Sequence, residues 1–203
     1  MYDLDPSLDA TVESGTNLLV SGPPLTGKRS LALDLLSEGT RRGEGAIVVT
    51  TKDSAERVLG QYADRVDYET EPVAVVDCVT RQQGVGDATE TELVKYASSP
   101  VDMTGIGIKL SEILQAFTAD RGLDRNRIVV HSLSTLLMYS NLQTVFRFLH
   151  VFTGRIQSVG ALGLFAIDST AHDEQTMNTL KQLFDGVITT SEDDPPALRM
   201  ASE

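Results

Sequence analysis

The stretch SGPPLTGKRSLA, residues 21–32, has the spacing of a phosphate-binding loop. Gly22 and Gly27 are separated by four residues, and Lys28 follows directly. In such a loop the backbone N–H groups and the start of the next helix face one anion, and the lysine contacts its phosphate oxygens. An intact loop continues with a serine or threonine that binds magnesium, whereas this chain has Arg29. The residues predicted to bind a phosphate or nucleotide are Gly22, Pro23, Pro24, Leu25, Thr26, Gly27, Lys28, Arg29 and Ser30.

Such a loop must lie between a buried strand and a helix, and the neighbouring sequence predicts both. The apolar run 17–21 predicts the strand, and the leucine-rich segment from about 28 to 37 predicts a helix that Gly39 ends. Further strands are predicted at 46–51, 72–77, 127–133, 161–168 and 185–191, and further helices at about 54–59, 108–120, 142–158 and 176–184. This alternation is typical of an α/β domain, a mostly parallel sheet with helices on both faces.

Two segments depart from the alternation. Residues 78–106 are rich in Gly, Ser, Thr and Asp and predict a long loop, for which a lid, an interface and simple disorder are all open. Residues 191–203 are acidic, contain two prolines and predict a tail. At 203 residues the chain has the length of one domain, so we expect a single domain over 1–203 with its core at about 15–190.

Composition excludes several classes of function. Asp and Glu number 29 against 17 Lys and Arg, which gives a net charge of −12. Binding to a nucleic-acid backbone depends on clustered basic residues, and the chain has no basic run, so we do not expect a nucleic-acid partner. There is no long apolar run and no basic start typical of a signal peptide, so we expect a cytoplasmic protein without a membrane partner. Cys78 is the single cysteine, which excludes an intrachain disulfide and a thiolate metal cluster.

From Asn17 to about Thr190, the order of elements resembles the RecA/KaiC-type P-loop ATPases, and within them the short single-domain KaiC-like proteins of halophilic archaea. An acidic composition with only five lysines is also similar to cytoplasmic proteins of those archaea, and composition alone does not separate this from an ordinary acidic protein. The resemblance implies a RecA-like fold, ATP or ADP as the ligand, and assembly with the nucleotide at a subunit boundary. The segments that carry it are GPPLTGK (22–28), TTKDSAE (50–56), SSPVDMTGIGI (98–108), RIVVHSLSTLL (127–137), YSNLQTVFRFLHVFTGRI (139–156) and LKQLFDGVI (180–188).

The resemblance also implies catalytic positions, and the chain departs from the family at three of them. The magnesium-binding hydroxyl falls on Arg29, and the Walker B aspartate falls on His131. The adjacent glutamates that orient the attacking water fall on Lys52 and Asp53. Magnesium requires oxygen ligands, and phosphoryl transfer depends on the metal and on a positioned water. We therefore expect neither tight magnesium binding nor efficient hydrolysis.

The sequence leaves more than one role open for two charged residues, Arg29 and Asp168. Arg29 either contacts a phosphate in place of the metal or points to solvent or to a carboxylate. Asp168 ends the strand 161–168, which in the family lies between the glycine-loop strand and the Walker B strand. It either forms a substitute metal site with Asp53, or it starts the next turn or caps the helix near His172.

These observations predict a nucleotide-binding module that acts in regulation or assembly, through a protein partner or self-association, and has lost efficient hydrolysis. One alternative is a slow ATPase that uses Asp53 or Asp168. The other is a protein-interaction domain whose glycine loop binds no nucleotide.

Overall fold

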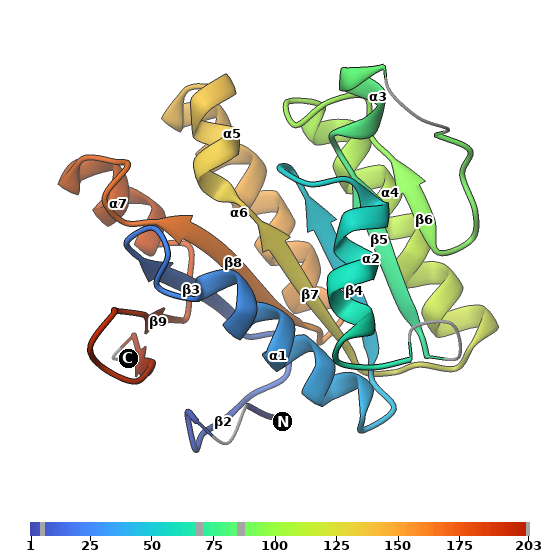
Figure 1. The fold of residues 1–203 in the computed structure, drawn as a ribbon, viewed down its shortest axis with the longest axis horizontal. Coiled ribbons are helices and arrows are strands. Elements are labelled where there is room, and N and C mark those ends of the chain that lie inside the picture. The colour runs from blue at the N-terminus through green and yellow to red at the C-terminus, as the bar shows by residue number, and fades with distance from the viewer. Residues whose placement is uncertain (5–6, 68–70, 85–87, 202–203) are drawn as a thin grey trace.

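The structure is a computed structural model, and it describes residues 1–4, 7–67, 71–84 and 88–201. Its centre is a sheet in the order β10-β9-β3-β8-β7-β4-β5-β6 (Figure 1). Neighbouring strands run parallel except for β10, which is antiparallel to β9. The strands are β3 Asn17–Gly22, β4 Gly45–Thr50, β5 Val73–Asp77, β6 Val94–Tyr96, β7 Asn126–His131, β8 Leu162–Asp168, β9 Gly186–Thr189 and β10 Ala197–Met200. The predicted α/β class is confirmed, and β8 lies between β3 and β7 as expected.

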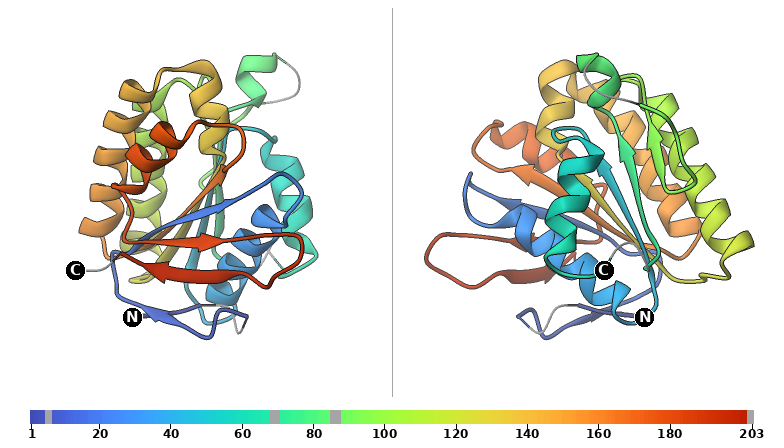
Figure 2. Two further views of the ribbon diagram at one scale, coloured as in Figure 1. Left: turned by 90° about the vertical axis from the view of Figure 1, so that its left-hand side faces the viewer. Right: turned by 45° about the vertical axis from the view of Figure 1, so that its right-hand side comes forward.

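Helices cover both faces of the sheet (Figure 2). On β3, Leu18 and Val20 pack into one core with α1 and α2, whereas Leu19 packs into a second core with α4 to α7. This division follows from the alternation of side chains along a strand. The helices are α1 Lys28–Thr40, α2 Ala55–Ala63, α3 Thr80–Gln83, α4 Met103–Gln115, the π-helical turn η1 Ala116–Asp120, α5 Leu133–Tyr139, α6 Leu142–Ser158 and α7 Glu174–Lys181. Within the described residues, no helix combines the length and the apolar character that a membrane span requires.

The prediction of a long loop at 78–106 was wrong. Its described part contains α3, β6 and the first turn of α4, while residues 85–87 lie outside the described residues. The strand β6 is only three residues long and partly exposed at the sheet edge, so it has no continuous apolar run. The helix α4 begins before the predicted start at 108 because Asp102 caps it, accepting a hydrogen bond of 2.9 Å from the N–H of Gly105.

Other boundaries also differ from the predictions. Residues 197–200 of the predicted tail form β10, an exposed strand without an apolar pattern, while 202–203 lie outside the described residues. The strand predicted at 127–133 ends at His131, since Ser132 caps the unpredicted helix α5 and accepts from the N–H of Thr135 at 3.3 Å. An amino-terminal hairpin of β1 Tyr2–Asp3 and β2 Thr11–Val12 was not predicted.

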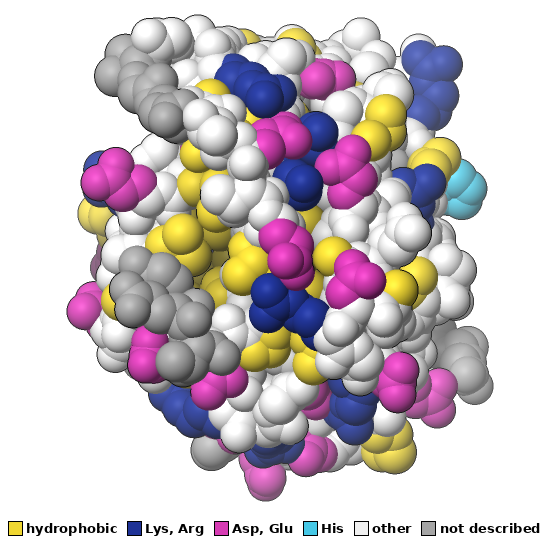
Figure 3. Space-filling model, turned by 90° about the vertical axis from the view of Figure 1, so that its right-hand side faces the viewer, with side chains coloured by type: hydrophobic (Ala, Val, Ile, Leu, Met, Phe, Trp, Pro, Cys, Tyr) yellow, Lys and Arg dark blue, Asp and Glu magenta, His cyan; other side chains and the backbone are white. Residues whose placement is uncertain are grey.

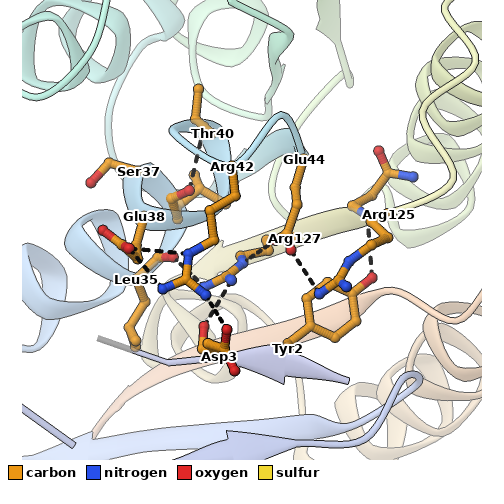
Figure 4. A network of polar contacts seen from close by, with 12 residues as sticks. Tyr2, Asp3, Leu35, Ser37, Glu38, Thr40, Arg42, Glu44, Arg125 and Arg127 are labelled. Atoms are coloured by element: carbon orange, nitrogen blue, oxygen red, sulfur yellow. Dashed lines mark hydrogen bonds and ion pairs between the residues drawn. The ribbon is translucent and has the colours of Figure 1, made fainter. Parts of the chain in front are cut away.

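A buried network holds this hairpin against the sheet (Figure 4). Arg127 of β7 is fully buried, and its Nε lies 2.5 Å from a carboxylate oxygen of Glu44. Its two terminal nitrogens donate to the carbonyls of Leu35 and Asp3, each at 2.8 Å. The prediction that Gly39 ends α1 was wrong, because the helix continues to Thr40. A Cβ atom on Gly39 would lie 2.4 Å from Nε of Arg127, so glycine is needed there for close approach rather than for helix termination.

Candidate functional site

The predicted phosphate-binding loop connects β3 to α1, as the sequence required. Gly27 precedes α1 in the left-handed conformation with φ of 79°. The hydroxyl of Thr26 donates to the carbonyl of Pro23 at 2.8 Å and lies 2.7 Å from the hydroxyl of Thr190. A Cβ atom on Gly22 would lie 2.2 Å from the same Thr190 hydroxyl. The two glycines of the motif therefore have separate roles, a left-handed turn at Gly27 and close packing at Gly22.

A cavity of about 780 Å³ lies beside this loop, outside the carboxyl ends of the parallel strands. Figure 1 shows the carboxyl ends of β4, β5 and β7 pointing toward the edge occupied by α3 and α5. Ligands of open α/β sheets bind outside these ends of the strands. The sequence-predicted residues that line the cavity are Pro24, Leu25, Gly27, Lys28, Arg29, Lys52, His131 and Asp168. The structure thus brings together residues from four separate parts of the chain.

Lys28 is partly buried at the start of α1, and its ammonium group donates a hydrogen bond to the carbonyl of Pro23. Burial lowers the pKa of Lys28 below its ordinary value, and the charge of Lys52 lowers it further. The charge of Asp168 acts in the opposite direction. Lys28 therefore lies within the electrostatic range of both charged neighbours across the cavity.

Arg29 pairs with a carboxylate, which is one of the alternatives left open by the sequence. Its guanidinium lies 2.5 Å from the carboxylate of Asp53, and Nε of Arg57 lies 3.1 Å from the second oxygen. Burial lowers the pKa of Arg29, and the neighbouring charge of Asp53 opposes this effect. Asp53 is buried and holds two cations, so the positive charge of Arg29 is compensated within the protein.

His131 ends β7 beside Thr50 of β4, with which it is in register. Burial lowers the pKa of His131 to about 4, and the charge of Arg29 contributes in the same direction. The imidazole is therefore neutral at pH 7. Its Nδ1 is buried and has no hydrogen-bond partner among the described residues. The next residue, Ser132, is joined to His131 by a cis peptide bond.

Asp168 ends β8 directly beside Gly22 of β3. Its carboxylate accepts hydrogen bonds from the N–H and the hydroxyl of Thr170 at 3.0 and 2.9 Å, so it starts the following turn. Burial raises the pKa of Asp168, but the bonds from Thr170 and the charge of Lys28 outweigh burial and lower it. The helix α7 is capped by Asp173 and not by Asp168.

The donor groups at this site do not fit a magnesium ion. A guanidinium and an imidazole stand at the positions expected to supply oxygen ligands, and the carboxylate of Asp53 is held by two arginines. In the described part of the chain, no group of three or more His, Cys, Asp and Glu side chains converges on a metal-sized site. The chain thus offers a cationic cavity wall instead of a coordination sphere for a hard cation.

The sequence analysis missed several residues of this site, among them Thr190 and Arg57. Thr190, at the end of β9, packs against the glycine loop from 164 positions away, and no local pattern indicates this contact. Arg57 pairs with Asp53 one helical turn earlier, and the spacing of four residues could have indicated that pair.

Comparison with protein families and curated sequences gives one family match and two relatives. A family of unknown function, DUF7504, matches residues 15–190. The UPF0273 protein PAE3143 of Pyrobaculum aerophilum is 31% identical over 140 residues, covering 66% of this chain and 47% of that protein. The UPF0273 protein SSO1861 of Saccharolobus solfataricus is 32% identical over 142 residues, covering 66% and 48%. The chain spans about half the length of these curated relatives.

Two solved structures from Pyrococcus horikoshii share the fold. The KaiC-like protein PH0186 superimposes with a TM-score of 0.64 at 14% identity, covering 94% of this chain and 81% of that chain. The uncharacterized protein PH0321, solved in complex with an unknown peptide, gives a TM-score of 0.71 at 11% identity, covering 95% and 86%. At these identities the comparison establishes a RecA-like fold of the KaiC-like type and not an activity.

Proposed function

The chain belongs to the family of unknown function DUF7504, and from its KaiC-like fold and its cationic cavity we propose that it binds the phosphates of ATP or ADP without hydrolysing the nucleotide efficiently. The bound nucleotide acts as a regulatory or assembly signal, read by a protein partner or by a second copy of the chain. The acidic, lysine-poor composition supports placing the protein among the KaiC-like proteins of halophilic archaea.

The observation that carries this proposal is the glycine loop between β3 and α1, with Lys28 at the start of the helix. The loop joins β3 to α1 with Gly22 and Gly27 in their required roles, and Lys28 lines the adjacent cavity. Backbone N–H groups at the start of α1 and the helix dipole both favour a negative charge at this place. Binding of phosphate needs no group beyond these.

Turnover requires groups that the cavity does not provide. Magnesium bound to a nucleotide would neutralise charge and orient the phosphates for attack by water. Arg29 is engaged by Asp53, and neither Lys52 nor His131 has a side-chain oxygen, so none of the three supplies an oxygen ligand for magnesium. The low pKa of His131, about 4, makes its imidazole a weak base. These substitutions support binding without efficient chemistry.

The substitution Lys28→Ala tests this proposal. We expect it to weaken binding of ATP and ADP at least tenfold by calorimetry, about 1.4 kcal/mol, because it removes the cation closest to the glycine loop. The matched control is Lys181→Ala, which removes an exposed lysine of α7 outside the cavity wall. Nucleotide affinity unchanged by Lys28→Ala would reject the phosphate-loop interpretation, and absence of binding to the unmodified protein would favour the interaction-domain alternative.

A further inference from the structure

The charges that line the cavity are unequal in number. Among the described residues they are three cations, Lys28, Arg29 and Lys52, and one carboxylate, Asp168. This local excess of positive charge occurs in a protein whose net charge is −12. An excess of one sign in a cleft concentrates ligands of the opposite sign.

The three cations differ in what balances them. Arg29 is paired with Asp53 at 2.5 Å, and Lys28 has the charge of Asp168 nearby. Lys52 is exposed on the cavity wall and makes no ion pair or hydrogen bond with any residue that the structure describes. The uncompensated charge of the cavity is therefore that of Lys52.

The charge of Lys52 acts on two other residues of the cavity wall. The charge of Lys52 lowers the pKa of both Lys28 and His131, so its ammonium group lies within electrostatic range of both. An anion between the two lysines would relieve this repulsion. The neutral imidazole of His131 adds no competing charge at pH 7.

The sheet places the two lysines on different sides of the cavity. Lys28 follows β3 and Lys52 follows β4, and the strands β8 and β7 lie between them. Backbone N–H groups of the glycine loop favour a phosphate on the β3 side, and each further phosphate of a nucleotide extends the anion into the cavity toward Lys52. A triphosphate therefore extends farther than a diphosphate.

Building on the proposed function, we propose that Lys52 is a second anion-binding residue, which contacts the terminal phosphate of a metal-free nucleoside triphosphate whose inner phosphates lie at the glycine loop beside Lys28. A diphosphate lacks the group that reaches Lys52. Lys52 thus distinguishes a triphosphate from a diphosphate by charge, without hydrolysing either.

The test is calorimetry of Lys52→Met with ATP and with ADP, both in EDTA. Methionine keeps much of the length of lysine and removes its charge. We expect the affinity for ATP to fall at least tenfold and the affinity for ADP to change less than twofold. The control Lys181→Met changes the net charge equally at an exposed position of α7 and is expected to leave both affinities unchanged.

The remaining outcomes separate this inference from the proposed function. If Lys28→Ala abolishes binding and Lys52→Met leaves ATP affinity unchanged, the nucleotide site stands and the role of Lys52 is overturned. Equal losses for ATP and ADP in Lys52→Met, or an equal loss in Lys181→Met, overturn it as well, because a general charge effect then explains the data. If the unmodified protein binds neither nucleotide, the proposed function itself is wrong.

Discussion

The carboxylate of Asp53 determines which cations of the cavity are free to meet an anion. It accepts Arg29 at 2.5 Å and Arg57 at 3.1 Å, so the arginine that replaces the magnesium-binding hydroxyl is bound to the protein's own acid. The same ion pair connects the first turn of α1 to the turn before α2. As a result, the positive charge available to a ligand comes from Lys28 and Lys52.

The buried imidazole of His131 makes the protein sensitive to acid. Its pKa falls from an ordinary 6.5 to about 4 in the folded state, so between these values the unfolded chain binds a proton that the folded chain does not. The free energy of unfolding therefore decreases as the pH falls from 6.5 to 4, by up to about 3 kcal/mol from this group. In urea unfolding at pH 7 and pH 5, His131→Asn should lose less stability on acidification than the unmodified protein, by about 2 kcal/mol.

The control for this experiment is His150→Asn, which changes an exposed histidine of α6. Protonation of carboxylates with lowered pKa values, such as Asp102 and Asp168, also lowers the free energy of unfolding in acid. This loss is the same in all three proteins. Identical pH dependence in His131→Asn and the unmodified protein would contradict the assignment of a buried neutral imidazole.

At the scale of elements, the amino-terminal hairpin packs against a buried ion pair, and its Tyr2 and Val12 also join the apolar core. Glu44 and Arg127 are 4% and 0% exposed, and Arg125 also binds Glu44 at 2.8 Å. The ring of Tyr2 stacks under Arg125, with 4.5 Å between the guanidinium carbon and the ring centroid. These contacts join β1 to the turn after α1 and to the residues at the start of β7 (Figure 4).

Removing one partner of the Glu44–Arg127 pair should destabilise the folded protein strongly. We expect Glu44→Ala to lower the free energy of unfolding by about 3–5 kcal/mol, because it leaves the Arg127 guanidinium buried without a counter-charge. Glu92→Ala, which removes an exposed partner of Arg121, should lower it by less than about 1 kcal/mol. Both values come from chemical denaturation, and equal losses in the two variants would show that the buried pair contributes no more than a surface pair.

The elements that the sequence predicts well are those with a continuous or strongly periodic apolar pattern. The five central strands are buried on both faces, and α6 has the predicted bounds 142–158. The strands β6 and β10 were missed because edge strands are short and half-exposed, and α5 because it is only seven residues long.

At the site, the sequence indicates the glycine loop by spacing, and the resemblance to the RecA/KaiC-type ATPases implies the positions at Lys52, Asp53 and His131. The register of β4 with β7 places Thr50 beside His131, because both strands end on the same side of the parallel sheet. The partner of Arg29 could not be predicted in the same way. Three fates were open to it, and the choice of Asp53 depends on how α1 packs beside the turn after β4.

At the scale of the whole molecule, the acidic surface does not form one continuous acidic field. Figure 3 shows basic and acidic side chains beside each other on the face that carries β6. Ion pairs around β6 and α4 include Glu90 with Lys109 at 3.0 Å and with Arg81 at 3.3 Å. Because exposed charges are screened beyond about 8–10 Å at physiological salt, the cations inside the cavity, and not the net charge of −12, set the potential that a bound anion meets.

The most direct test of a nucleotide site without efficient turnover is to measure binding and chemical fate of ATP together. The purified protein is titrated with ATP in magnesium and in EDTA, and the bound and free nucleotide is then identified by mass spectrometry. We predict affinities that agree within about threefold between the two conditions, since Lys28 and Lys52 supply the positive charge. We also predict ATP recovered intact. Magnesium-dependent release of phosphate at about one per second that is lost in Lys28→Ala would contradict the account, because that rate is ordinary for a working enzyme.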